Sequence, residues 1–210
     1  MKAPFFCLVL AALPAFGGHQ DTSLAPIALY TQFQHPLPVA VAAALKAEVD
    51  FIMSPSGLRF TWRELLSAPG GDASVELAVI TFKGRCDVTG LNANTSYDGP
   101  LGWTEISDGV ILPFAEVDCQ SVRDFIQRQL LRMPPESREA TYGRALGRVL
   151  AHELYHIFAN TTSHSSCGVG KAKFTVQDLV SPEFLFEGRE SLTLKGSKAY
   201  AALQWAAFGR

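Results

Sequence analysis

The sequence predicts one α+β domain, because strand-like and helix-like hydrophobic patterns occupy different parts of the chain. Residues 74–86 and 101–119 carry the alternating pattern of strands. From Ser121 onward the hydrophobic period changes from two residues to 3.6, which is typical of helices. The chain has no internal repeat and no linker, so residues 18–210 are expected to form a single domain with a small mixed sheet packed on helices.

In the first half, local signals predict one helix and four strands. A polar, proline-bearing lead-in over residues 18–37 comes before an alanine-rich segment that favours a helix, with Pro38 suited to its first turn. Turn residues separate the segments that follow, and the last two form a hairpin around the turn at 107–109. The predicted strands cover residues 57–65, 74–86, 101–106 and 110–119.

In the second half, three helices are expected. The first covers residues 121–133, with Ser121 as its cap and two prolines after it. A longer helix covers residues 136–160, where Asn160 can adopt the left-handed conformation that ends helices. A mixed region follows, and residues 196–210 predict a terminal helix.

Composition limits the partners that this protein can have. Of the 210 residues, 48% are hydrophobic and 18% are charged, and the net charge is -2 with no basic run. Binding to nucleic acid requires clustered Lys and Arg against the phosphates, so a nucleic-acid partner is not expected.

The N-terminus is typical of a secretory signal peptide. Lys2 is followed by an apolar run over residues 4–16 and then by small residues, with a cleavage motif at Ala15-x-Gly17. We therefore expect residues 1–17 to be removed and the protein to be secreted or periplasmic; a buried N-terminal helix is the alternative. No later segment is long and apolar enough to insert into a membrane.

Three cysteines remain after the signal peptide is removed, and export favours a disulfide. Cys86 and Cys119 both come at the ends of predicted strands, so they could meet across the sheet. The preferred pair is Cys86–Cys119, with Cys167 left free; the alternative is that all three are reduced.

The segment "HELYHIFANTTSH" (residues 152–164) indicates a metal site. His152 and His156 are four residues apart on the long helix, so their imidazoles lie on one face, one turn apart. Two such imidazoles can bind one cation, and zinc favours nitrogen ligands in tetrahedral geometry. Glu153 can reach a water held by the metal and take its proton, which is the role of a general base.

The third ligand is less closely defined by spacing. His164 is the preferred residue, because the segment after Asn160 gives the chain room to fold back. It could instead be an ordinary surface histidine on a loop. Zinc also accepts carboxylates and thiolates. The rival ligands are therefore Glu187, Glu183, Asp178 and, less well suited, Cys167.

These residues resemble the zincin metallopeptidases, and among them the metzincins such as matrixins and archaemetzincins. The expected order of elements, with helix, strands and hairpin before the long helix, is also similar. The resemblance implies a zincin-like fold, zinc bound by His152, His156 and His164, and Glu153 as general base. The metzincin pattern H-E-x-x-H-x-x-G-x-x-H would have glycine at position 159 and histidine at position 162, where this chain has Ala159 and Thr162. It also lacks the methionine turn, because Met133 is its last methionine.

The expected function is therefore zinc-dependent hydrolysis of peptide bonds in a peptide or protein substrate. By analogy, the hairpin at residues 101–113 could hold the substrate, or it is an ordinary core hairpin. A second electrophile could come from Tyr142, Tyr155 or Tyr200. The alternatives are a non-catalytic zinc-binding domain and a different zinc hydrolase.

Overall fold

A five-stranded mixed sheet forms one layer of the molecule in the computed structural model, which describes residues 25–67 and 74–208. The strand order is β2-β1-β3-β5-β4, and only β4 runs antiparallel to its neighbour. β4 is thus an edge strand, next to β5 in the predicted hairpin. The strands are β1 (Ala25–Phe33), β2 (Thr61–Glu64), β3 (Ser74–Lys83), β4 (Gly102–Ser107) and β5 (Val110–Asp118).

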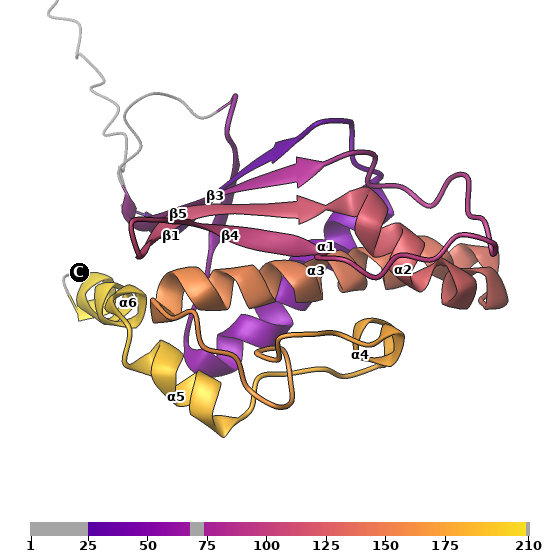
Figure 1. The fold of residues 1–210 in the computed structure, drawn as a ribbon. Coiled ribbons are helices and arrows are strands. Elements are labelled where there is room, and N and C mark those ends of the chain that lie inside the picture. Colours follow the sequence, from indigo (N-terminus) through magenta and orange to yellow (C-terminus); the bar gives the residue numbers. More distant parts are fainter. Residues whose placement is uncertain (1–24, 68–73, 209–210) are drawn as a thin grey trace, which may run out of the picture.

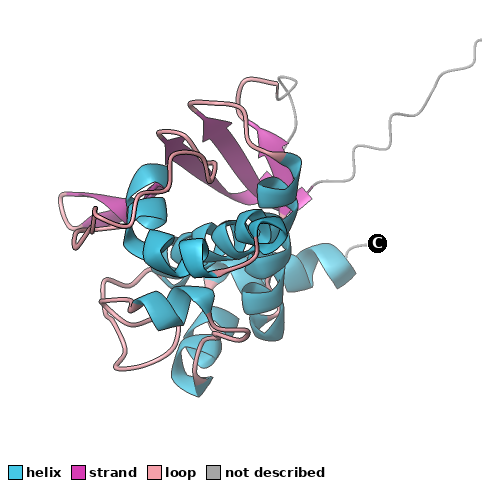
Figure 2. Cartoon of the chain, turned by 90° about the vertical axis from the view of Figure 1, so that its right-hand side faces the viewer, coloured by secondary structure: helices cyan, strands magenta, loops and turns pink. Residues whose placement is uncertain are grey.

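The long helices lie together below the sheet, as Figures 1 and 2 show. This arrangement confirms the α+β class. The helices are α1 (Val39–Met53), the short 3₁₀ turn η1 (Ser54–Ser56), α2 (Cys119–Arg132), α3 (Pro135–Ala159), α4 (Val176–Val180), α5 (Gly188–Lys195) and α6 (Lys198–Phe208). None of the helices in the described part of the chain has the length and hydropathy needed to cross a membrane. The predicted signal peptide at residues 1–17 and the loop at 68–73 lie outside the described residues.

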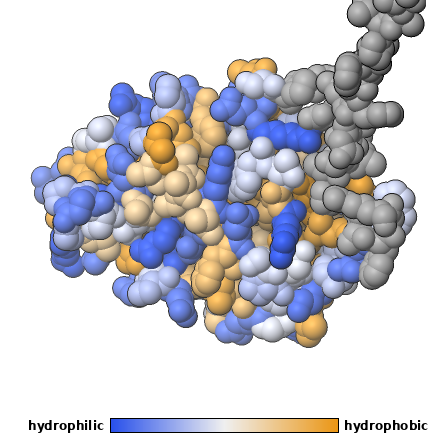
Figure 3. Space-filling view, turned by 180° about the vertical axis from the view of Figure 1, so that it is seen from behind, coloured by the Kyte–Doolittle hydropathy of each residue, from blue (hydrophilic) through white to orange (hydrophobic). Residues whose placement is uncertain are grey.

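The strands bury their side chains mainly on the face that the helices cover. In β3, Ala78, Ile80 and Phe82 are fully buried, while the residues between them are partly exposed. This alternation is the pattern of a sheet with one covered face. Seen from behind, the described surface mixes hydrophobic and hydrophilic residues, as is usual for the surface of a folded domain (Figure 3).

The lead-in over residues 18–37, for which no strand was predicted, contains β1, which begins at Ala25. β1 pairs in parallel with β2 on one side and β3 on the other. Its consecutive residues Ile27, Ala28 and Leu29 are all fully buried. A strand that is buried on both faces has a short continuous apolar run instead of clean alternation, and here the nearby polar residues and prolines obscured it.

Helices α1 and α3 pack closely because two glycines of α3 face α1. A Cβ atom at Gly143 would lie 2.5 Å from the carbonyl oxygen of Val41, and one at Gly147 would lie 2.9 Å from that of Leu45. Glycine inside a helix costs about 1 kcal/mol relative to alanine. Here that cost is accepted because the missing side chains let the backbones of α1 and α3 approach closely. The contact fixes α3 against the core.

A buried ion pair also joins the two helices. Arg148 of α3 is fully buried, and its Nε donates to Oε1 of Glu48 of α1 at 2.6 Å. The same guanidinium donates to the carbonyl of Asp178 at 2.7 Å and to the hydroxyl of Ser181 at 3.2 Å. Leaving one charge of such a pair without its partner costs about 3–5 kcal/mol. Arg148 thereby fastens the chain around α4 to α3, one turn before His152.

The predicted disulfide between Cys86 and Cys119 is confirmed, and Cys167 is free and exposed. The bond joins the chain after β3 to the first residue of α2, and disulfides of this kind persist in oxidising compartments. The cap predicted for this helix is wrong. Asp118, not Ser121, is the N-cap, and its side chain accepts a hydrogen bond from the Ser121 amide at 2.9 Å. The helix therefore begins at the end of β5, without an intervening loop.

Candidate metal centre

The C-terminal end of α3 carries two buried histidines on one face. His152 is 8% exposed and His156 is 7% exposed, and both face the same cavity. The Nδ1 atom of His152 lies 2.7 Å from the carbonyl oxygen of Val169, and the Nδ1 atom of His156 lies 2.7 Å from that of Thr161. Hydrogen bonds of this kind set both the orientation and the tautomer of an imidazole.

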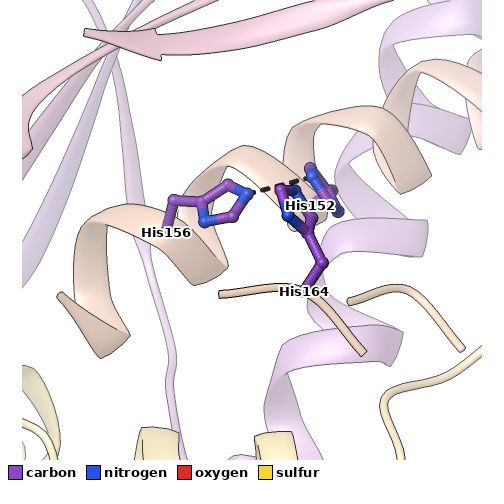
Figure 4. Close-up of side chains that lie close together, drawn as sticks. All are labelled: His152, His156 and His164. Atoms are coloured by element: carbon purple, nitrogen blue, oxygen red, sulfur yellow. Dashed lines mark hydrogen bonds between the residues drawn. The ribbon is translucent and has the colours of Figure 1, made fainter. Parts of the chain in front are cut away.

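The chain reverses immediately after α3 and brings a third imidazole to the same place. Asn160 has φ of 48° and forms the left-handed cap, as its residue type predicts. The ring centroid of His164 then lies 5.2 Å from that of His152 and 4.8 Å from that of His156. One nitrogen from each of the three rings lies within 4.8 Å of the other two (Figure 4). His164 itself is exposed.

The hydrogen bonds of the two buried imidazoles leave both Nε2 atoms as acceptors. Because a carbonyl oxygen only accepts, the Nδ1 atoms of His152 and His156 must donate, and a neutral ring then has a bare Nε2. These two Nε2 atoms are 3.0 Å apart. Two lone pairs at that distance repel each other unless a proton or a metal ion lies between them.

Both buried imidazoles favour the neutral form in the metal-free protein. Burial lowers the pKa of His152 to about 4; the hydrogen bond to Val169 opposes this shift, and the neighbouring imidazoles add to it. Burial also lowers the pKa of His156, against the opposing effect of its bond to Thr161. Neutral imidazole is the form that binds metals. The cluster of His152, His156 and His164 can therefore hold a metal ion.

The loop after α3 is held by its own hydrogen bonds and by a bond to the segment around Leu185. The amide of Ser165 donates to the carbonyl of Gly170 at 2.9 Å, which closes the loop on itself. Val169 is fully buried, and its amide donates to the carbonyl of Leu185 at 3.1 Å. Phe174 packs against the His152 ring edge-on, with centroids 5.4 Å apart. These contacts keep the Val169 carbonyl in reach of His152.

Glu153 faces the same cavity as the histidines. It is 5% exposed, and its Oε2 accepts a hydrogen bond from the hydroxyl of Thr104 in β4 at 2.8 Å. Burial raises the pKa of Glu153 to about 7 in the metal-free protein, although the bond from Thr104 lowers it. A carboxyl group of α3 thus lies in the same cavity as the three imidazoles, against the wall that β4 forms.

The cavity has a volume of about 570 Å³ and lies between α3, β4 and the segment at 171–174. Its polar wall contains the three histidines, Glu153 and Thr104. Apolar side chains line much of the rest, among them Leu101, Phe125, Val149 and Phe174. An apolar cavity with a few converging polar groups is the usual form of a ligand or substrate site.

The rival ligands do not belong to the cluster that the described residues form. Asp178 is paired with Lys171 at 2.6 Å and forms the capping box of α4 with Thr175. Glu187 is the N-cap residue of α5. Neither Glu183 nor Cys167 has a ligand atom in the cluster.

None of the three tyrosines considered as electrophiles lines the cavity. Tyr142 is fully buried, and its hydroxyl donates to the carbonyl of Cys119 at 2.6 Å, so this residue supports the core instead. Tyr155 packs against Phe186, with ring centroids 5.4 Å apart. The aromatic ring of Tyr200 lies against Gly57. The prediction of a tyrosine at the site thus finds no support in the cavity wall.

The partners of the site that sequence reasoning missed are Thr104 and the carbonyls of Thr161 and Val169. A backbone carbonyl is present at every residue, so the sequence contains no signal for these two. Thr104 comes from the predicted hairpin, but its distance from Glu153 along the chain hid the contact. No protein-family model matches the chain, and the comparison with curated proteins finds no match either. Its function is therefore inferred from its own residues and geometry.

Proposed function

We propose that this protein is an exported zinc metallopeptidase of the zincin type, with His152, His156 and His164 as zinc ligands and Glu153 as general base. The observation that carries the proposal is the facing pair of Nε2 atoms, 3.0 Å apart, with a third imidazole beside them and a carboxylate in the same cavity. A purely structural metal site has no use for that carboxylate.

The donor set fits zinc. Three neutral imidazoles suit a tetrahedral ion with Zn–N distances of about 2.0–2.1 Å, which would separate the nitrogens by roughly 3.3 Å. The distance between the Nε2 atoms of His152 and His156, 3.0 Å, is close to that value. Three protein ligands leave the fourth position open, which is the pattern of catalytic zinc sites rather than structural ones.

Each residue of the site then has a defined task. When bound, zinc supplies Lewis-acid chemistry, because it lowers the pKa of a coordinated water and polarises a carbonyl group. Glu153 takes the proton of the attacking water and delivers it to the leaving amine. The bonds to Val169 and Thr161 hold the imidazoles of His152 and His156 in the ligating tautomer.

The cavity also supports a peptide substrate. β4 is the edge strand of the sheet and forms one wall of the cavity, so an extended peptide can pair with its backbone beside the metal. This position favours the substrate-binding role of the hairpin at 101–113 over that of an ordinary core hairpin. The zincin resemblance is supported by the same arrangement of an edge strand beside the helix that carries the motif.

Export is the remaining part of the proposal. The Cys86–Cys119 disulfide is consistent with an oxidising compartment, as is the signal-like pattern of residues 1–17. We therefore expect the enzyme to act outside the cytoplasm, either secreted or in a periplasm.

The test is cleavage of a mixed peptide library by the zinc-loaded protein, with Glu153→Ala beside it. Glu136→Ala is the matched control, because Glu136 is an exposed residue at the far end of the same helix. We expect the wild type and Glu136→Ala to cleave, and Glu153→Ala to keep its zinc while its kcat falls by about 10²- to 10⁴-fold. If none of the zinc-loaded proteins cleaves any peptide, the protein is a non-catalytic zinc domain and the proposal is wrong.

A further inference from the structure

The edge strand β4 contacts Glu153 at two places on one of its faces. Gly102 and Thr104 are two residues apart, so both are directed toward α3 while Trp103 between them faces away. The hydroxyl of Thr104 lies 2.8 Å from Oε2 of Glu153 and 3.2 Å from its backbone carbonyl. A hydroxyl has one proton to donate, and the shorter contact makes Oε2 its main acceptor.

Gly102 provides the space for the other carboxylate oxygen. A Cβ atom at this position would lie 3.1 Å from Oε1 of Glu153, 3.0 Å from Cγ1 of Val149 and 2.8 Å from the carbonyl oxygen of Glu116. Any larger residue would therefore press on the carboxylate or displace the strand. The glycine is needed here for close approach.

We propose that Thr104 and Gly102 are positioning residues for Glu153: Thr104 holds Oε2, and Gly102 keeps Oε1 free to accept the proton of the attacking water. The inference depends on the proposed function and deepens it by assigning different roles to the two oxygens. The terminal torsion of a glutamate side chain has broad minima, so a carboxylate without an anchor would sample many orientations. One hydrogen bond from β4 removes that freedom, and β4 thus orients the base as well as lining the substrate cavity.

The activity test uses a pair of substitutions at Thr104. Thr104→Val keeps the shape of the side chain and removes the hydroxyl, while Thr104→Ser keeps the hydroxyl. We expect kcat to fall about 10- to 100-fold in Thr104→Val with KM and zinc content little changed, because a misplaced catalytic group slows the chemical step. We expect Thr104→Ser to recover most of the loss. Thr31→Val is the matched control, since the hydroxyl of Thr31 in β1 donates to the carbonyl of Arg63, away from the cavity.

A structural measurement separates this inference from the proposed function. In crystal structures of the metal-free variants, the Glu153 carboxylate should be rotated away from its wild-type orientation in Thr104→Val. In Thr104→Ser it should keep the wild-type orientation. Gly102→Ala should displace Oε1 or β4. This comparison decides the inference even if the wild type cleaves no peptide. The inference is overturned if the carboxylate keeps its orientation in Thr104→Val, or if Thr104→Ser loses as much activity as Thr104→Val.

Discussion

The end of α3 and the loop that follows it supply the two halves of the candidate metal centre in different ways. His152 and His156 are buried and have the spacing of one helical turn, so the helix alone places them together. His164 is exposed, and its place depends on a loop that is fastened to distant parts of the chain, including Leu185 and, through Arg148, the region of α4. One half of the site is thus preformed by local structure, and the other is assembled by tertiary contacts.

Removing a helix ligand should have the largest effect. We expect His152→Ala to weaken zinc binding by about a thousandfold or more, because two ligands and water hold zinc poorly and a preformed ligand is lost. His35→Ala is the control, since His35 is exposed and outside the cluster. Competition with a chromophoric chelator measures both affinities. Unchanged binding in His152→Ala would remove the basis for a metal site on α3.

Removing the loop ligand should cost less. We expect His164→Ala to weaken zinc binding about 10- to 100-fold, since ordering an exposed loop histidine offsets part of what its ligation contributes. Glu187→Ala should leave the affinity unchanged in the same assay. If instead Glu187→Ala weakens zinc binding and His164→Ala leaves the affinity unchanged, the third ligand is a carboxylate.

Zinc should protect the loop from proteolysis more than it protects the helix. Cleavage within residues 161–174 requires the loop to open and the metal to leave, so zinc at ten times its Kd should slow this cleavage about tenfold. No cutting within α3 is expected with or without zinc. The Glu153→Ala background avoids self-cleavage, and mass spectrometry locates the sites. Equal susceptibility of the loop with and without zinc would mean that it does not take part in metal binding.

The smallest effect is expected for Phe174, which supports the site without contacting the metal. Phe174→Ala removes the ring packed against His152 and should weaken zinc binding about threefold, because the apolar surroundings of a site tune its affinity. Phe51→Ala is a suitable control, since Phe51 is an exposed residue of α1 and does not line the cavity. A loss as large as that of His164→Ala would mean that loop packing, and not ligation by His164, governs the affinity.

Much of the fold could be predicted because its signals are local. The long helix with its Asn160 cap, the hairpin of β4 and β5, and the pairing of Cys86 with Cys119 all follow from residue patterns within or at the ends of single elements. β1 was missed because its consecutive residues Ile27, Ala28 and Leu29 are all buried, so both faces of the strand are covered there and the alternation is lost. The cap at Asp118 was missed because strand and helix meet there without a loop.

In the candidate site, too, the features set by local spacing could be predicted and the long-range contacts could not. The spacing of His152, Glu153 and His156 points to a metal and a base, and the structure brings these residues together with His164 as the sequence led us to expect. The contact with Thr104 joins residues 49 positions apart, and it depends on β4 packing over α3, which no local pattern shows. The carbonyls that orient the imidazoles are positioned by the fold of the loop, and no residue type in the sequence indicates them.

X-ray absorption at the zinc edge of the metal-loaded protein tests the central claim most directly. Our account predicts a single zinc with three imidazole nitrogens at about 2.0–2.1 Å, one further oxygen ligand and no sulfur. Scattering from sulfur at about 2.3 Å would indicate a thiolate, and Cys167 is the free cysteine of the described chain. That result would replace the open catalytic centre with a closed structural one and contradict the proposed peptidase.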